Sequence, residues 1–350
     1  MSRVTERFSA DTPRLSRRPL TGSKVDQALF VDREVEIEAI LAAIGMQLNV
    51  FVSGAPGSGK TSLLRRLETI LVKERTPVAY VNAEAGTSAA GLISAVAAAI
   101  SPGIDSGSSW VTVADDETDL EVIEEAIATR AVERLVLLVD GVSADVMMTL
   151  FGRYRDRLWQ SPELIWVVAT RMAAPPRPAD AFFDRVITMD PLSREAVEEL
   201  LKRRASAMDE EHRRQLAAAL GSVQPLEALV HAQTLALSVD PETVLEAVGA
   251  YRALVEALPG RLRSLLEALL SVGPTYAGDE RLLAWLGTSR PRVVAGLKEL
   301  VERDLVRSDR DGRRQIYSVK SGLGELHAKH GRPDSRTRAV ATPHTKQKSS

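Results

Sequence analysis

The chain has 350 residues, of which 45% are hydrophobic, 26% charged and 4% aromatic, and this length predicts two or three domains. Its 45 basic and 47 acidic residues leave a net charge of −2, so the total charge does not indicate a polyanionic partner. The absence of cysteine excludes disulfides, thiolate zinc sites and a cysteine nucleophile, and it fits a reducing compartment. No apolar run reaches the roughly 18 residues of a membrane span, and no apolar segment marks a secretion signal, so we expect a cytoplasmic protein without a membrane partner.

The near-zero net charge is the sum of regions of opposite sign. Residues 1–24 carry a net charge of +4, residues 25–258 carry −14, and residues 259–320 and 331–350 carry +4 each. Basic ends around an acidic body indicate either contact with nucleic acid or ends that are only solvated and disordered.

The composition predicts a disordered basic arm at residues 1–24 and a disordered basic tail at 329–350, because neither segment has a sustained apolar period. Between them, residues 25–190 alternate apolar runs with amphipathic segments, which predicts an α/β domain with a parallel sheet and helices on both faces. We expect strands at 48–53, 78–82, 135–140, 164–170 and 185–189. Helices are expected at 33–44, 60–73, 88–100, 117–131 and 144–158.

Two further domains follow along the chain. Residues 191–258 show helical patterns only, at 193–205, 208–220, 225–238 and 241–256, with Ser193 and Asp240 as N-caps. Residues 259–328 read as three helices and then two short strands, at 305–308 and 315–319. The strands flank Asp311-Gly312, a strong hairpin signal.

A phosphate-binding loop follows the first apolar strand and precedes an amphipathic helix. The pattern G-x-x-x-x-G-K-[ST] is matched at every fixed position by Gly54, Ala55, Pro56, Gly57, Ser58, Gly59, Lys60 and Thr61. The glycines let successive backbone N–H groups point at one phosphate, and the N-terminus of the helix adds partial positive charge. Lys60 is expected to reach the β- and γ-phosphates, Thr61 to ligate Mg²⁺, and Ser62 to line the site.

A second Mg²⁺-ordering carboxylate is expected at Asp140, because five apolar residues lead directly to this acid. The residue after such an acid is often a glutamate that polarises the attacking water, and here it is Gly141. Glu84, after the second predicted strand, is the substitute we consider for a catalytic base. The site is therefore expected to bind nucleotide and to hydrolyse it weakly, with the catalytic base left open.

Polar residues also end the fourth predicted strand. Thr170 and Arg171 can contact the γ-phosphate or position water there, or they can simply cap a helix and face solvent. Before this strand, Arg153, Arg155 and Arg157 read as a solvated face, with an arginine finger acting between subunits as the minority alternative. The five histidines show no metal-ligand spacing.

These features, in this order, resemble the AAA+/STAND branch of P-loop ATPases, which includes origin-recognition-type initiators and signalling regulators. The segment Leu29-Phe30-Val31-Asp32-Arg33-Glu34 is similar to the F-x-G-R-E box of that branch, with Asp32 in place of the usual Gly. The segment Gly221-Ser222-Val223-Gln224-Pro225-Leu226 looks like its G-x-P segment, although the arginine common there is absent. The resemblance implies ATP or ADP with Mg²⁺, a helical lid at residues 191–258, and Val31 and Pro225 beside the nucleotide.

The third domain resembles a winged helix-turn-helix. The residues that would contact DNA are Arg290, Arg292 and Lys298 on its third helix and Arg310, Arg313 and Arg314 at the hairpin turn. Such modules also serve in protein contacts, so this alternative stays open.

Two functions compete on this reading. One is an ATPase whose nucleotide state controls DNA engagement through the winged helix. The other is a slow or non-hydrolysing STAND-type switch that forms ATP-dependent homo-oligomers and uses the third domain for protein contacts. A degraded ATPase that survives as a scaffold is a third reading, which the intact Gly59-Lys60-Thr61 disfavours.

Overall fold

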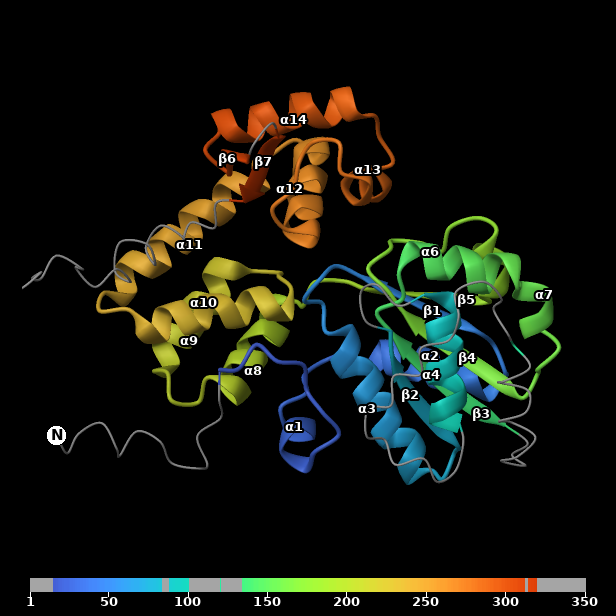
Figure 1. The fold of residues 1–350 in the computed structure, drawn as a ribbon. Coiled ribbons are helices and arrows are strands. Elements are labelled where there is room, and N and C mark those ends of the chain that lie inside the picture. Colours follow the sequence, from blue (N-terminus) through green and yellow to red (C-terminus); the bar gives the residue numbers. More distant parts are fainter. Residues whose placement is uncertain (1–14, 84–87, 101–119, 121–133, 312–313, 320–350) are drawn as a thin grey trace, which may run out of the picture.

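The computed structural model describes residues 15–83, 88–100, 120, 134–311 and 314–319. These residues form three units with separate hydrophobic packing: a sheet unit over residues 34–189, a helical unit over 194–256, and a C-terminal unit over 260–319. Helix α11 (Pro241–Glu256) leads from the helical unit to the C-terminal unit (Figure 1). The predicted 117–131 helix, Glu84, Arg313 and the predicted 329–350 tail lie outside the described residues, Leu120 excepted.

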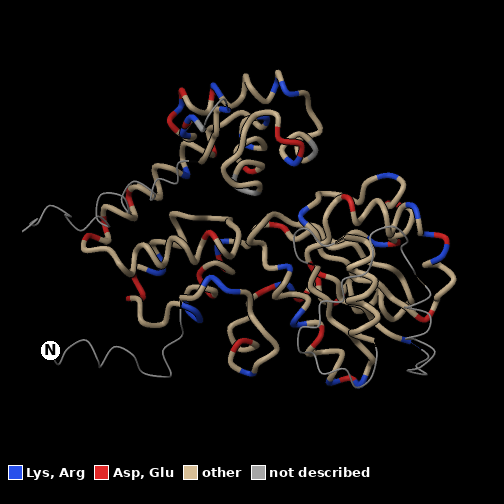
Figure 2. The backbone as a smooth tube through the Cα atoms, in the orientation of Figure 1, with Lys and Arg blue, Asp and Glu red and all other residues tan. Residues whose placement is uncertain are grey.

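Charged residues of both signs occur on all three units (Figure 2). Along the C-terminal unit, basic residues are interspersed with acidic ones. In the described part of the chain, no helix is both long and apolar enough to span a bilayer.

The sheet unit is a five-stranded parallel sheet in the order β2-β3-β4-β1-β5, which confirms the predicted α/β fold. All five strands lie within two residues of the predicted positions. The strands are β1 Val50–Gly54, β2 Val78–Asn82, β3 Leu135–Asp140, β4 Leu164–Ala169 and β5 Arg185–Met189.

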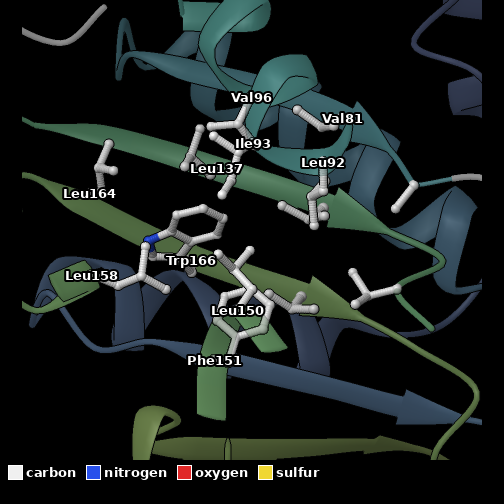
Figure 3. Packing of buried hydrophobic residues seen from close by; sticks show 14 of the residues in the cluster. Val81, Leu92, Ile93, Val96, Leu137, Leu150, Phe151, Leu158, Leu164 and Trp166 are labelled. Carbon is white, nitrogen blue, oxygen red and sulfur yellow. The ribbon is translucent and has the colours of Figure 1, made fainter. Parts of the chain in front are cut away.

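Alternate residues of each central strand supply two separate cores, one on each face of the sheet. Leu137 and Val139 of β3 join the first core, whereas Val136 and Leu138 join the second. Helices α2 (Glu34–Gly45) and α3 (Lys60–Lys73) cover the second face. The first face is covered by α4 (Ala89–Ile100) and by the segment around Phe151, which packs near Trp166 (Figure 3). Burial on both faces is why these strands read as continuous apolar runs.

The helix predicted at 144–158 is present as three consecutive pieces. These are α6 (Ala144–Val146), a π-helix η2 (Met147–Arg153) and α7 (Arg155–Leu158). The aromatic ring of Phe151 within η2 lies 5.0 Å from that of Phe182, which belongs to the 3₁₀ turn η3 (Ala179–Phe182). Tertiary packing of these rings accompanies the change in helix type, which periodicity alone does not predict.

The helical unit contains four helices at the predicted positions: α8 Arg194–Arg204, α9 Glu210–Leu220, α10 Pro225–Leu237 and α11 Pro241–Glu256. Both predicted N-caps are confirmed, because the side chain of Ser193 accepts a hydrogen bond from Ala196 N and that of Asp240 accepts one from Thr243 N. An isolated antiparallel bridge pairs Leu192, just before α8, with Val223, just before α10.

The C-terminal unit contains α12 (Gly260–Val272), α13 (Glu280–Leu286) and α14 (Arg290–Glu302), followed by the hairpin strands β6 (Val306–Asp311) and β7 (Arg314–Val319). The hairpin is longer than predicted, because its pairing runs up to Asp311 and Arg314. An isolated antiparallel bridge pairs Thr275, which precedes α13, with Tyr317 of β7. Ser289 is the N-cap residue of α14, although its side chain makes no capping hydrogen bond.

Residues 15–24 differ from the disordered arm that their composition predicts. Leu15 packs against the core of the helical unit, and Leu20 is buried beside α3. The buried carboxylate of Asp26 in α1 (Lys24–Ala28) accepts two hydrogen bonds from Arg18, at 2.7 and 2.8 Å, and two from Thr21. Contacts with residues far along the chain hold this segment, and its own composition does not reveal them.

Candidate nucleotide-binding site

The phosphate-binding loop joins β1 to α3, as predicted. Gly57 and Gly59 have φ angles of 82° and 96°, in the left-handed region that glycine adopts without strain. The ammonium group of Lys60 lies within the loop and donates hydrogen bonds to the backbone oxygens of Gly54 at 2.7 Å and Ala55 at 2.9 Å. The loop therefore surrounds a cation at the N-terminus of a 14-residue helix, where an anionic phosphate is stabilised.

The pKa of Lys60 is lowered to about 8, chiefly by burial; the negative charge of Asp140 opposes this shift, and the positive charge of Arg171 adds to it. A phosphate bound in the loop would add negative charge beside this ammonium and raise its pKa again. The geometry thus favours a protonated Lys60 when an anion is present.

Asp140 ends β3 and is buried, with 7% of its surface exposed. Its Oδ2 atom accepts a hydrogen bond from Thr61 Oγ1 at 2.6 Å and another from Tyr80 OH at 3.1 Å. The predicted pair of Mg²⁺-ordering residues is therefore in direct contact, although the two residues are 79 positions apart. Within the described ranges, no cluster of three or more His, Cys, Asp or Glu side chains could hold a metal ion.

Tyr80 is a member of this site that sequence reasoning missed. It lies on β2, two residues before Asn82, which is the register partner of Asp140. Burial raises the pKa of Tyr80, as does the charge of Asp140, so the phenol stays protonated and acts as a hydrogen-bond donor. The guanidinium of Arg65 lies 3.4 Å from the centre of its ring. The sequence offered one signal for Tyr80: it is a residue with a polar hydroxyl near the end of a predicted strand, two residues before that strand ends at Asn82.

Gly141 occupies a position that no larger residue fits without strain. Its φ is 82°, and a Cβ placed there would lie 2.8 Å from the backbone oxygen of Ala83. The missing glutamate noted in the sequence is therefore excluded sterically, because a glutamate needs both a Cβ and a normal φ.

Thr170 and Arg171 follow β4, between the phosphate loop and Asp140. The hydroxyl of Thr170 is buried, donates to Val142 O at 3.1 Å and accepts from Met172 N at 3.2 Å. The hydroxyl proton of Thr170 is thus used in a hydrogen bond to the backbone oxygen of Val142. A contact between Thr170 and the γ-phosphate stays a prediction. Arg171 is exposed and lies close enough to affect Lys60.

The helical unit contacts the phosphate loop through the start of α10. The backbone N–H of Leu226 donates to Gly57 O at 3.2 Å. A Cβ added at Gly57 would lie 2.6 Å from Leu226 Cβ, and one at Gly59 would lie 4.0 Å from Pro225 Cγ. Pro225 therefore lies beside the phosphate loop, as expected, and Leu226 is a contact residue that the sequence did not single out.

The segment before α2 holds the sheet unit against the helical unit. Asp32 and Arg33 have φ angles of 61° and 78°, so Asp32 adopts the conformation for which glycine is usual. The buried guanidinium of Arg33 donates to Asp190 O and to Glu36 at 2.8 Å. Val31 packs against the core of the helical unit. Ser62, one residue beyond Thr61, accepts a hydrogen bond from Leu20 N at 3.0 Å.

Basic residues predicted to contact DNA are exposed on the C-terminal unit, namely Arg290, Arg292, Lys298, Arg310 and Arg314. Arg314 lies 4.7 Å from the ring centre of Tyr276, and the side chain of Arg290 lies against Gly278. The turn at 276–278 thus brings the start of α14 close to the hairpin. Glu299, an acidic residue of α14, is engaged by Arg261 at 2.9 Å and Arg303 at 3.0 Å.

Arg155 and Arg157 are half-buried, and Arg153 is exposed. The guanidinium of Arg155 lies 4.8 Å from the ring centre of Trp159. These positions fit the solvated face that the sequence favours, and an arginine finger stays untested.

A family model described as "AAA domain" matches residues 45–168. This segment is thus similar to AAA domains. It contains the phosphate loop, Tyr80 and Asp140, so the match covers the candidate site itself. None of the curated proteins matches the chain.

Among solved structures, the chain is similar to the Aeropyrum pernix ORC1 protein in complex with DNA (17% identity, TM-score 0.46, 86% of this chain and 93% of that chain). It is also similar to the Thermotoga maritima RuvB Holliday junction branch migration motor (18% identity, TM-score 0.42, 89% and 98%). A third similarity is to the Drosophila ORC bound to DNA (16% identity, TM-score 0.44, 92% and 92%).

Proposed function

We propose that this protein binds ATP with Mg²⁺ at the phosphate loop of its AAA domain, hydrolyses it slowly, and uses its nucleotide state to control DNA engagement. The observation that carries the nucleotide site is the 2.6 Å hydrogen bond from Thr61 to Asp140, beside Lys60 within the same loop. ADP is the product that stays in the site.

The donor set fits Mg²⁺. Thr61 and Asp140 offer hydroxyl and carboxylate oxygens, which are the hard ligands this ion prefers, and the remaining ligands come from phosphate and water. The ion, when bound, neutralises charge that develops on the phosphates. Lys60 holds the phosphates by its charge, and the backbone N–H groups of the loop orient them.

The coupling from nucleotide to the rest of the chain begins at Leu226. Its N–H donates to Gly57 O in the phosphate loop, so a phosphate that rearranges the loop also acts on α10. The helical unit then serves as a lid, and α11 transmits its position to the C-terminal unit.

DNA engagement would use the C-terminal unit as a winged helix-turn-helix. Its three helices, hairpin and Thr275–Tyr317 bridge support this reading. Arg290 and Arg292 at the start of α14 would approach base edges or phosphates, and Arg310 and Arg314 of the hairpin would bind phosphates.

A STAND-type switch is the second candidate, and the structure at Gly141 favours it. Because a glutamate does not fit there, turnover depends on another base, and the described residues of α10 offer no arginine toward the phosphates. Such a switch would retain nucleotide, form ATP-dependent homo-oligomers and use the C-terminal unit for protein contacts.

The test is to measure ATP affinity and steady-state ATPase activity with and without duplex DNA, comparing wild type with Lys60→Ala and Asp140→Asn. We expect Lys60→Ala to abolish ATP binding and Asp140→Asn to abolish the Mg²⁺-dependent part of it. DNA affinity should change several-fold on adding ATP.

The outcomes separate the candidates. Retained nucleotide with negligible turnover, ATP-driven oligomers and no DNA binding at low salt would favour the switch. ATP affinity that is unaffected by Lys60→Ala would overturn both.

A further inference from the structure

The carboxylate of Asp140 has two hydrogen-bond donors, and only one of them belongs to the phosphate loop. Thr61 donates at 2.6 Å from α3, and Tyr80 donates at 3.1 Å from β2. Both bonds go to the same atom, Oδ2, so together they fix the rotation of the carboxyl group about its terminal bond.

We propose that Tyr80 is a positioning residue for the Mg²⁺ site: its hydroxyl orients Asp140 so that the other carboxylate oxygen faces the metal and its water ligands. This inference rests on the proposed nucleotide function and names a residue that acts through Asp140. Partners of this kind orient a ligand and raise the affinity for the metal.

The surroundings of Tyr80 make its position well defined. The ring packs against the core between the sheet and α3. On its other side the guanidinium of Arg65 lies 3.4 Å from the ring centre, and Glu68 holds Arg65 at 2.9 Å. A phenol held in this way loses little conformational freedom when it donates to Asp140.

Sheet order creates this contact. Strand β2 pairs only with β3 in the described sheet, and Tyr80 is opposite Leu138, two residues before Asp140 on the same face. This diagonal spacing is within reach of an aromatic side chain. Thr61 approaches the same carboxylate from the helix, so Asp140 is held from two independent elements.

The experiment measures the affinity for ATP by calorimetry over a range of MgCl₂ concentrations and in EDTA, comparing wild type with Tyr80→Phe. The variant keeps the ring and removes only the donor, so its melting temperature should stay close to that of wild type. We expect the Mg²⁺ concentration at half-maximal effect to rise about 10-fold, with the affinity in EDTA changed less than twofold.

Two controls separate positioning from a general effect on the fold. Tyr154→Phe makes the same change elsewhere in the sheet unit and should leave the Mg²⁺ midpoint at its wild-type value. In the Asp140→Ala background, Tyr80→Phe should produce no further change at any Mg²⁺ concentration, because the acceptor is gone.

A Mg²⁺ midpoint within twofold of wild type in Tyr80→Phe would overturn the inference and leave the proposed function intact. An equal loss of affinity in EDTA and in Mg²⁺ would also overturn it, because it would indicate damage to the site rather than to metal positioning. If wild type itself binds no ATP, the proposed function fails first and the inference fails with it.

Discussion

Asp140 and Gly141 are neighbours at the end of β3, yet the fold constrains them in opposite ways. The carboxylate of Asp140 is surrounded by donors, whereas Gly141 faces the backbone oxygen of Ala83, which comes directly after β2. The backbone N–H of Gly141 is itself used, donating to Ala169 O at 2.9 Å. The glycine is thus a requirement of close strand packing, and the position is closed to the glutamate that would polarise water in the proposed ATPase.

We predict that Gly141→Glu lowers the melting temperature by several degrees and does not increase ATPase activity. The left-handed φ and the 2.8 Å approach to Ala83 O impose a cost of about 1–3 kcal/mol. Gly249→Ala in α11 is the control, because a Cβ there meets nothing within 4 Å and should stabilise the helix. A stable Gly141→Glu protein with raised turnover would contradict the steric argument.

A second residue-level prediction concerns His231 of α10, which is 7% exposed. Burial, and to a lesser extent the positive charge of Arg252, lowers its pKa to about 4. Below pH 6.5 the unfolded chain therefore takes up a proton that the folded chain does not, and stability falls as the pH drops from 6.5 toward 4.

His231→Leu should therefore lose part of this acid sensitivity, by up to about 3 kcal/mol between the two pH values. Melting temperatures measured from pH 7 to pH 4 test this. His212→Leu on α9 is the matched control, since His212 is more exposed than His231. Identical pH profiles for wild type and His231→Leu would show that His231 takes up its proton in the folded state as readily as in the unfolded chain.

Among the elements, the N-terminal segment 15–23 makes the least expected contacts. It contacts α3 through Leu20 and Ser62, and it contacts the helical unit where Gln233 and Arg204 donate to its backbone oxygens. The same segment thus contacts both the sheet unit and the helical unit. We infer that it helps to hold these two units together.

Asp26→Ala tests the anchor of this segment. Hydrogen bonds from Arg18, together with those from Thr21, hold the pKa of Asp26 well below its usual range, so the buried carboxylate is charged and fully engaged. Its removal leaves Thr21 N without this partner and should cost about 1–3 kcal/mol. We expect a lower melting temperature and faster proteolysis within residues 15–23.

Asp145→Ala, at an exposed position in α6, should change the melting temperature little. Equal effects of the two substitutions would mean that the segment contributes nothing to the folded state.

Across the molecule, net charge differs between regions of the chain. The acidic net charge of −14 lies in residues 25–258, and a basic +4 lies in residues 259–320. On the C-terminal unit, Glu299 is occupied by Arg261 and Arg303, whereas Arg290 and Arg314 lie near one turn. Ion pairs between neighbouring side chains, rather than the net charge of the region, decide which arginines are available to a polyanion.

We predict that Arg290→Ala and Arg314→Ala each weaken duplex DNA binding and reduce the magnitude of the salt slope by about 1. Arg303→Ala, at the C-cap of α14, is the control, because its guanidinium is already bound to Glu299 at 3.0 Å. The measurement is DNA affinity as a function of salt concentration. A salt slope equal to that of wild type in both variants would remove these arginines from the interface.

Most elements were predictable because their signals are local. Apolar runs such as 135–140 become buried strands, and Ser193 and Asp240 act as caps through bonds to nearby N–H groups. The π-helix at Met147–Arg153 was not predictable, since ring packing with Phe182 is a tertiary effect. The ordered segment 15–23 was also not predictable, because its backbone groups form hydrogen bonds with residues far along the chain, such as Ser62 and Gln233.

The sequence alone determined the phosphate loop and the acid at Asp140, because strand, glycine loop, lysine and helix are consecutive and their chemistry depends on local order. The tertiary structure decided which side chains share that site. Tyr80 reaches Asp140 only because β2 pairs with β3, and Leu226 reaches Gly57 only because the helical unit packs beside the sheet. Contacts between distant residues depend on strand order and on domain packing, and neither is encoded in a local pattern.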